Sequence, residues 1–171
     1  MSQQDIVLRE KFLFILEWLL AVANRYPTRI QFNIVHINFA NSRLLGDTYG
    51  AQEAVHKLDE VLHSLINGFR KTDLVARDGT DFWALFPYTS SDEKLAIKIK
   101  YIIHIASKHG LQIVGRDISI FSMPFAAQKL DENCSAKDIL LYFKKNRITL
   151  ATYKVMLPPS KEVDAQLSAA A

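Results

Sequence analysis

Residues 70–87 read RKTDLVARDGTDFWALFP, and this stretch decides the fold. Apolar residues stand on both sides of Asp78-Gly79, and an Asp-Gly pair between apolar runs is the strongest short signal for a β-hairpin. Glycine supplies the positive φ angle that such a turn requires. The stretch therefore predicts two antiparallel strands, over residues 73–77 and 82–86, that are joined by a tight turn at Gly79.

The hairpin lies in the middle of an alternation of helical and strand patterns. Four segments carry apolar residues at intervals of three and four, which predicts helices; they are residues 5–24, 51–69, 91–109 and 136–145, the last capped by Ser135. Three more segments are rich in β-branched and aromatic residues, which predicts strands; they are residues 30–39, 111–121 and 150–156. For the second of these, the alternative is a strand that is broken at Gly115-Arg116-Asp117. The first of these strands is apolar on both faces, as a buried central strand is.

This order of elements predicts an α+β domain, in which helices surround a central mixed, mostly antiparallel sheet. We expect the domain to span residues 1–156. A flexible tail is expected over residues 157–171, because the sequence from Pro158 onward has no hydrophobic periodicity.

The chain has enough apolar side chains for one core, since 49% of its 171 residues are hydrophobic. Trp83 and Phe86 of the hairpin are expected in that core. Trp18 of the first helix is expected there too, and the alternative for it is an outward position that faces a partner.

Composition excludes several classes of function. The formal net charge is only +3, without the dense basic stripe that marks a binder of nucleic acid polymers. Cys134 is the only cysteine, which excludes an intrachain disulfide and favours a reducing, cytoplasmic compartment. Neither Cys134 nor the five histidines have the spacing of zinc ligands. The longest apolar stretch, residues 12–23, is too short to span a bilayer, so recruitment to the inner membrane would require partner proteins.

The hairpin resembles the signature hairpin of the GGDEF family, the diguanylate cyclases that make cyclic di-GMP from two GTP molecules. The family's signature turn reads Gly-Gly-Asp/Glu-Glu-Phe, whereas this chain has Gly79-Thr80-Asp81-Phe82-Trp83. Upstream stands Arg70-Lys71-Thr72-Asp73, which preserves the Arg-x-x-Asp string of the family's inhibitory site for the product. The resemblance covers residues 6–153, and it implies the nucleotidyl cyclase-like fold of that family.

The resemblance also implies that the catalytic site is degenerate. When the chain is aligned through Tyr49-Gly50, the family's metal-binding Asp falls on Asn38, and an amide is a poorer ligand for magnesium than a carboxylate. The family's Asn and Asp that contact guanine fall on Gly46 and Val55, which cannot replace them. Asp81 survives, but an isolated acid at this place is more typical of a turn residue that bonds its own backbone.

We therefore expect no cyclase activity, because the loss of even one transition-state contact typically costs about 10²-fold in rate. No catalytic residue and no metal ligand is assigned. The expected remnants of the active site are Asn38, Gly79, Thr80, Asp81 and Phe82.

Arg70 and Asp73 have the chemistry that a receptor for cyclic di-GMP needs. A guanidinium can donate two parallel hydrogen bonds to a phosphate or to guanine O6 and N7, and a carboxylate can accept from guanine N1–H and N2–H₂. Lys98 or Lys100 of the following helix can add a cation. The alternative is an inert surface ion pair, which is the usual meaning of such a string.

The sequence thus predicts a catalytically inactive GGDEF domain that binds cyclic di-GMP and needs no cofactor. The resemblance implies two ligand molecules per site. Among degenerate GGDEF receptors, the arrangement resembles the C-terminal domain of a regulator of bacterial cellulose secretion, which implies other domains of a longer chain and proteins of a cellulose synthase complex as partners. The alternatives are a nucleotide-independent protein-interaction scaffold, a GTP-binding domain without turnover, and residual cyclase activity.

Overall fold

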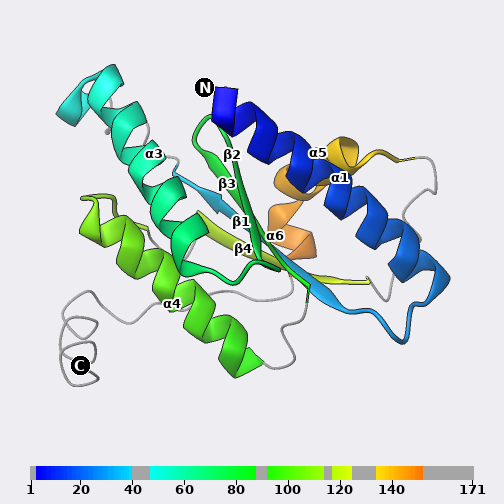
Figure 1. The fold of residues 1–171 in the computed structure, drawn as a ribbon. Helices are drawn as coiled ribbons and strands as arrows, with labels where there is room; N and C mark the ends of the chain where they lie inside the picture. The colour runs from blue at the N-terminus through cyan, green and yellow to red at the C-terminus, as the bar shows by residue number, and fades with distance from the viewer. Residues whose placement is uncertain (1–2, 40–46, 88–91, 114–116, 125–133, 152–171) are drawn as a thin grey trace.

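The structure is a computed structural model, and it describes residues 3–39, 47–87, 92–113, 117–124 and 134–151. Figure 1 shows the order of its elements, which is α1 (Gln3–Arg25), β1 (Phe32–Asn38), α3 (Ala51–Gly68), β2 (Leu74–Asp78), β3 (Asp81–Phe86), α4 (Asp92–Lys108), β4 (Ile118–Met123), α5 (Ala136–Lys145) and α6 (Arg147–Leu150).

The four strands form one sheet in the order β2-β3-β1-β4, and all three neighbouring pairs are antiparallel. β1 lies between β3 and β4, which confirms the prediction of a buried central strand. The predicted α+β class is confirmed as well. The register places Asn38 at the end of β1 directly opposite Asp81 at the start of β3.

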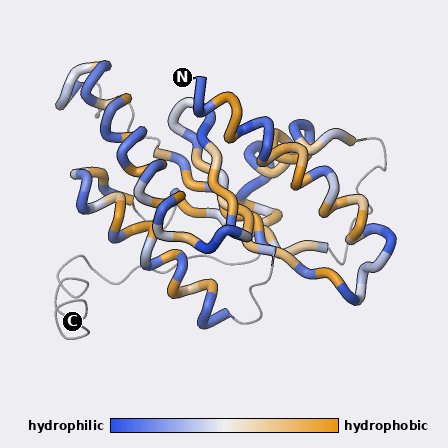
Figure 2. The backbone as a smooth tube through the Cα atoms, viewed as in Figure 1, coloured by the Kyte–Doolittle hydropathy of each residue, from blue (hydrophilic) through white to orange (hydrophobic). Residues whose placement is uncertain are grey.

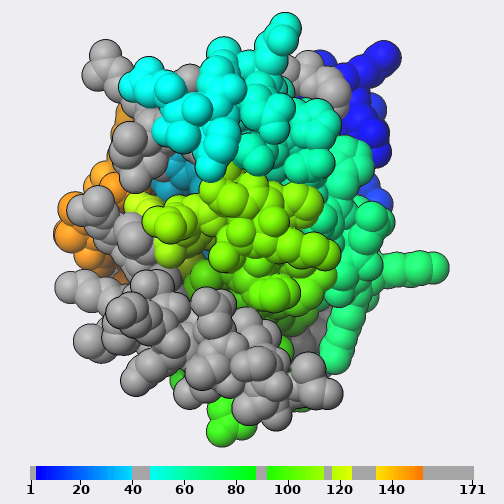
Figure 3. Space-filling model, turned by 90° about the vertical axis from the view of Figure 1, so that its left-hand side faces the viewer, coloured from blue at the N-terminus to red at the C-terminus, as the bar shows by residue number. Residues whose placement is uncertain are grey.

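Two layers of helices cover the sheet. α3 and α4 pack on one face, against a cluster that includes Val35 and Ile37 of β1. α1 and α5 pack on the other face, against a cluster that includes Phe32 and Ile34. Figure 2 shows the strands as mostly hydrophobic between these layers, because successive side chains of a strand point to opposite faces and both faces are covered. Figure 3 shows α3 and α4 side by side on one surface of the molecule.

The hairpin has the predicted geometry. Gly79 lies between β2 and β3 with a φ of 64°, a conformation that glycine adopts without steric cost. Trp83 is 6% exposed and Phe86 is fully buried, so both belong to the core as expected.

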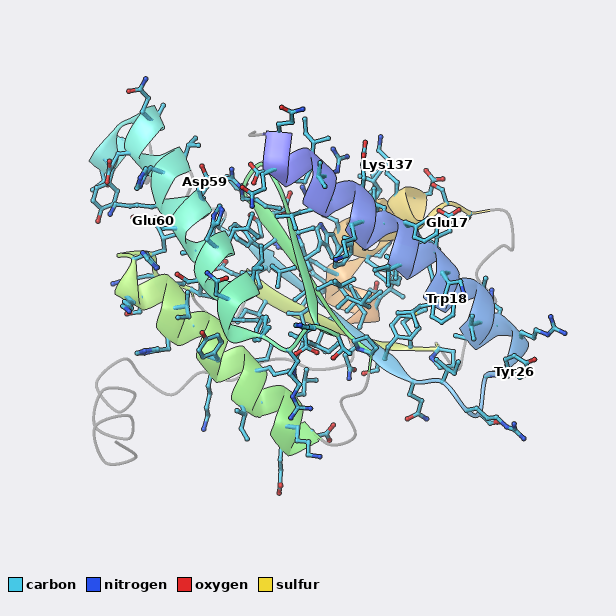
Figure 4. The ribbon with its side chains drawn as sticks, viewed as in Figure 1. Glu17, Trp18, Tyr26, Asp59, Glu60 and Lys137 are labelled. Atoms are coloured by element: carbon cyan, nitrogen blue, oxygen red, sulfur yellow. The ribbon has the colours of Figure 1, made fainter. Side chains whose placement is uncertain are left out.

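A buried ion network joins both helical layers to the edge strand β2. Nη2 of Arg77 donates to Asp5 of α1 at 3.1 Å and to Asp59 of α3 at 2.5 Å. The side chains of Arg77 and Asp5 are 4% and 1% exposed. Figure 4 shows Asp59 on the side of α3 that faces the sheet and the start of α1.

Three expectations are corrected by the structure. Trp18 is 59% exposed and lies outside the core. The strand expected over residues 111–121 begins only at Ile118 and ends at Met123, although Leu111 and Ile113 are buried. Leu150 ends the short helix α6 instead of beginning a strand, since its backbone N–H bonds Asn146 O at 3.0 Å. Residues 152–156 and the expected tail lie outside the described residues.

The described helices are also too short or too polar for a transmembrane span: none of them could cross a lipid bilayer.

Candidate functional site

The two groups of expected site residues lie at opposite ends of β2. Arg70 and Asp73 precede its first residue, Leu74, and Gly79, Thr80 and Asp81 follow its last. A strand of five residues is about 17 Å long. The signature turn and the Arg-x-x-Asp string are therefore separate sites.

The structure brings the remnants of the expected active site together. Asn38 pairs with Asp81 in the β1–β3 register, and the backbone N–H of Phe39 donates to Thr80 O at 3.1 Å. Asn38 thus stands beside the surviving acid, where the resemblance expects a second carboxylate. Gly46 lies outside the described residues, and Val55 is 46% exposed on α3.

Asp81 is not the turn residue that the sequence predicted. It begins strand β3, and its side chain bonds two other side chains instead of its own backbone. Nε2 of His36 donates to Oδ1 at 2.8 Å, and the ammonium group of Lys144 on α5 pairs with Oδ2. Burial opposes ionisation of Asp81 and raises its pKa, but the hydrogen bonds and charges of His36 and Lys144 outweigh burial, so the pKa of Asp81 is lowered overall. The surviving acid is an ionised carboxylate that already has two partners.

His36 is the residue that sequence reasoning missed. It is fully buried in β1, and its ring stacks on Trp83 with centroids 4.3 Å apart. Since the ionised Asp81 can only accept, the proton of this hydrogen bond belongs to Nε2 of His36. The two residues are 45 positions apart in the chain, so only the register of β1 and β3 reveals the contact.

Phe82 occupies the position where the family has Glu. Its side chain is fully buried in the core between the sheet and α3, and its ring meets that of Phe39 edge-on with centroids 5.0 Å apart. The position therefore faces apolar packing and not a solvent-filled site. Across the described residues, no group of three or more His, Cys, Asp or Glu side chains could hold a metal ion.

A small pocket lies beside Asp81, between α1, the hairpin and α5. Its walls include Arg9 and Phe12 of α1, Asp81 and Trp83 of β3, and Lys137 and Lys144 of α5. Its volume is about 70 Å³, whereas pockets for drug-sized ligands enclose roughly 300–1,000 Å³. The pocket is too small for a nucleotide.

The Arg-x-x-Asp string forms a turn between α3 and β2. The backbone N–H of Asp73 donates to Arg70 O at 2.9 Å, which closes the turn. The guanidinium of Arg70 is exposed to solvent. The side chain of Asp73 is only 5% exposed, and its Oδ2 is paired with the ammonium group of Lys98 on α4.

Lys98 lies at this turn, and Lys100 has a different direction. The Nζ atom of Lys98 is 4.6 Å from the ring centroid of Phe86 and 5.4 Å from that of Phe69. Residues two apart on a helix point about 200° apart, so Lys100 cannot project toward Asp73 as Lys98 does. Of the two lysines that the sequence suggested, the structure brings Lys98 to Asp73.

One further polar cluster joins α3 to the end of α4. His109 lies 3.0 Å from the hydroxyl of Ser64 through Nε2 and 3.2 Å from Glu60 through Nδ1. Glu60 is labelled in Figure 4 on α3. These bonds fix one helix to the other.

Comparison with known proteins was made by sequence and by structure. No family model matches the chain, and no curated protein matches it in sequence. Its fold, in contrast, is found in many solved structures. The GGDEF domain of YfiN (TpbB) from Pseudomonas aeruginosa is 18% identical, with a TM-score of 0.58 over 89% of this chain and 96% of the other.

Two further structures are similar to a comparable degree. The GGDEF domain of DgcB from Caulobacter crescentus, solved in complex with c-di-GMP, is 16% identical with a TM-score of 0.59 over 82% of each chain. The active GGEEF domain of a diguanylate cyclase from Vibrio cholerae is 16% identical, with a TM-score of 0.56 over 80% of this chain and 90% of the other. The chain therefore has the fold of GGDEF domains.

Proposed function

We propose that this chain is a GGDEF-fold domain that binds cyclic di-GMP through Arg70 and Asp73 and does not synthesise it. The observation that carries the proposal is the turn after α3, where the exposed Arg70 stands three residues before a carboxylate that is paired with the Lys98 ammonium group. A cyclic dinucleotide presents both phosphates and guanine edges, and this set of groups matches both.

The roles of the three side chains follow from their chemistry and exposure. Arg70 is exposed and can donate two hydrogen bonds to a phosphate or to the O6 and N7 atoms of guanine. Asp73 accepts from the N1–H and N2–H₂ groups of guanine. Lys98 pairs with Asp73 in the ligand-free domain, and it can turn its ammonium group to a phosphate when guanine takes its place.

The proposed inability to synthesise cyclic di-GMP rests on the residues around the signature turn, at the other end of β2. Magnesium-assisted phosphoryl transfer needs carboxylates that are free to bind the metal. Asn38 offers an amide, Phe82 is buried in the core, and Asp81 is already bonded by His36 and Lys144. A metal ion would have to displace both partners of Asp81 and would find no second carboxylate at Asn38.

The structural neighbours support the class of ligand, since the DgcB domain was solved in complex with c-di-GMP. We further propose two ligand molecules per site and a cytoplasmic role in cellulose secretion. The combination of an Arg-x-x-Asp string with a degenerate signature turn downstream resembles the C-terminal domain of BcsE, a regulator of bacterial cellulose secretion. Other domains of a longer chain and the proteins of a cellulose synthase complex are the proposed partners, and they would recruit the domain to the inner membrane.

Titration calorimetry with cyclic di-GMP tests the proposal. The wild type should bind, and Arg70→Ala should bind at least about tenfold more weakly, which corresponds to roughly 1.4 kcal/mol. Arg29→Ala is the matched control, because Arg29 is another exposed arginine in a turn, the one after α1. It should bind like the wild type.

Three results would refute parts of the proposal. Equal affinities of wild type and Arg70→Ala would refute the site. No heat from the wild type at high micromolar ligand would favour a scaffold that binds no nucleotide. Binding of GTP without binding of cyclic di-GMP would indicate a GTP-binding domain instead.

A further inference from the structure

Helix α1 carries a second apolar face that its own domain does not cover. Its inner face includes Phe12, Leu16 and Leu20, which are buried against the sheet and α5. On the opposite side, Phe14 is 76% exposed, and Val7 and Trp18 are each 59% exposed. A helix that is apolar on both sides is normally buried on both sides, so this outer face indicates an interaction surface.

The outer face has the spacing of a helix–helix contact. Its residues follow each other at alternating intervals of four and three; they are Val7, Lys11, Phe14, Trp18, Ala21 and Arg25. Intervals that alternate between four and three keep the residues on one stripe of a helix, along which a second helix can pack. We call these six residues the α1 seam. Figure 4 labels Trp18 on the part of α1 that leads to Tyr26.

We propose that the α1 seam is a homodimer interface, in which α1 packs antiparallel against α1 of a second copy of this chain. A two-fold interface uses one surface on both copies, so that the surface must be complementary to itself. When the two α1 helices run in opposite directions and their seams share one centre, Phe14 lies against Trp18 of the second copy. The same arrangement sets Lys11 against Ala21 and Val7 against Arg25.

Charge distinguishes the antiparallel from the parallel arrangement. In a parallel pair, Lys11 would face Lys11 and Arg25 would face Arg25, and like charges repel. In the antiparallel pair, each cation faces an apolar residue, and its aliphatic stem can cover that residue while the charge stays in water. Glu17 lies beside the seam, but its Oε2 accepts from the backbone N–H of Ala136 at 3.3 Å and is held toward α5.

The area is sufficient for a weak dimer. Large aromatic side chains each bury about 150–250 Å², so covering the exposed parts of Phe14 and Trp18 removes on the order of 300 Å² per copy from water. With the remaining residues of the seam, the total over both copies approaches about 1,000 Å², which is the lower limit for a specific interface. Interfaces near this limit are weak and transient, so we expect dimers only at high protein concentration.

Sedimentation velocity over a concentration series tests the interface. The wild type should shift from the mass of one 19.5-kDa chain toward twice that mass as the concentration rises. Phe14→Glu combined with Trp18→Glu should remain monomeric at every concentration. Ile97→Glu is the control, because Ile97 is a 66% exposed apolar residue on α4, in the other helical layer. This variant should dimerise like the wild type, and circular dichroism should show that all three proteins are folded.

The orientation is tested with cysteines in a Cys134→Ser background, which removes the one exposed native thiol. A mixture of Phe14→Cys and Trp18→Cys proteins should oxidise mainly to the mixed disulfide. An excess of either symmetric disulfide would refute the antiparallel arrangement. A wild type that stays monomeric up to about 500 µM, or a glutamate variant that dimerises like the wild type, would refute the interface.

Discussion

His36 and Asp81 lie on neighbouring strands of the sheet and share a hydrogen bond, in which Nε2 of His36 donates to Oδ1 of Asp81 at 2.8 Å. Lys144 of α5 pairs with the other carboxylate oxygen. The acid beside the signature turn thus links β1, β3 and α5. In an active cyclase such a carboxylate could take part in catalysis, whereas here it stabilises the fold. We therefore expect the free energy of unfolding to depend on whether Asp81 is ionised.

Acid should weaken the fold through Asp81. The pKa of Asp81 is lowered below its ordinary value of 3.8, because the bonds and charges of His36 and Lys144 outweigh the effect of burial. The unfolded chain therefore takes up this proton more readily than the folded chain. The carboxylate stabilises the fold fully above the unfolded pKa, and its contribution is lost as the pH falls through the lower, folded pKa.

Urea unfolding of the wild type and Asp81→Asn at several pH values measures this effect. The wild type should be more stable by about 1–2 kcal/mol near pH 6, and the difference should shrink as the pH falls below 3.8. Asp78→Asn is the control, since Asp78 is 54% exposed in a surface ion pair. A wild-type advantage that stays constant down to low pH would contradict the assignment.

The Arg77 network should be sensitive to the loss of its cation. Arg77→Met would leave the carboxylate of Asp5, which is 1% exposed, buried without the guanidinium. Breaking a buried ion pair in this way costs about 3–5 kcal/mol. Arg9→Met removes another arginine, whose 3.5 Å pair with Asp78 lies at the surface, and should cost at most about 1 kcal/mol. Urea unfolding of both variants checks the order, and equal losses would contradict it.

Local signals explain which parts of the fold could be predicted. The hairpin followed from Asp78-Gly79 because the conformation of a tight turn depends on the turn residues themselves. The helix over α5 was equally local, since Ser135 caps it by accepting from Asp138 N. The strand at β4 was placed too early, because Leu111 and Ile113 are apolar and buried without belonging to a strand. An apolar residue indicates that the position is buried, but it does not indicate whether the backbone there forms a strand.

The site depended on contacts between distant residues, and these were not predictable. Asp81 was taken for a turn residue because neither His36 nor Lys144 is near it in the sequence. Trp18 was expected in the core, with an outward position as the alternative, and periodicity alone cannot say which face of α1 is covered. Arg70 and Asp73 were recognised as a pair from their spacing, whereas the ion pair between Asp73 and Lys98 requires α4 to lie beside the turn.

Lys98 and Asp73 should be energetically coupled. The side chains are 17% and 5% exposed, so removal of either one leaves a partly desolvated charge. A double-mutant cycle with Lys98→Ala and Asp73→Ala, followed by urea unfolding, should give a coupling energy of about 1–3 kcal/mol. Lys100→Ala combined with Asp73→Ala is the matched control and should show additive effects. Additivity in both cycles would mean that Lys98 does not hold Asp73 in solution.

The purified chain should make no cyclic di-GMP from GTP and magnesium. Asn38 lies opposite Asp81 in the sheet, so Asn38→Asp would restore a carboxylate beside the surviving acid. This variant should also make no product, because Asp81 stays bonded to His36 and Lys144 and Phe82 keeps its position in the core. A product assay by chromatography, with the active GGEEF domain from Vibrio cholerae as the positive control, decides the point. Product from the wild type would show that the signature turn still works with a single acid. Product from Asn38→Asp alone would show that the missing carboxylate was its one decisive defect, and that the bonds to Asp81 open readily when a metal ion competes for it.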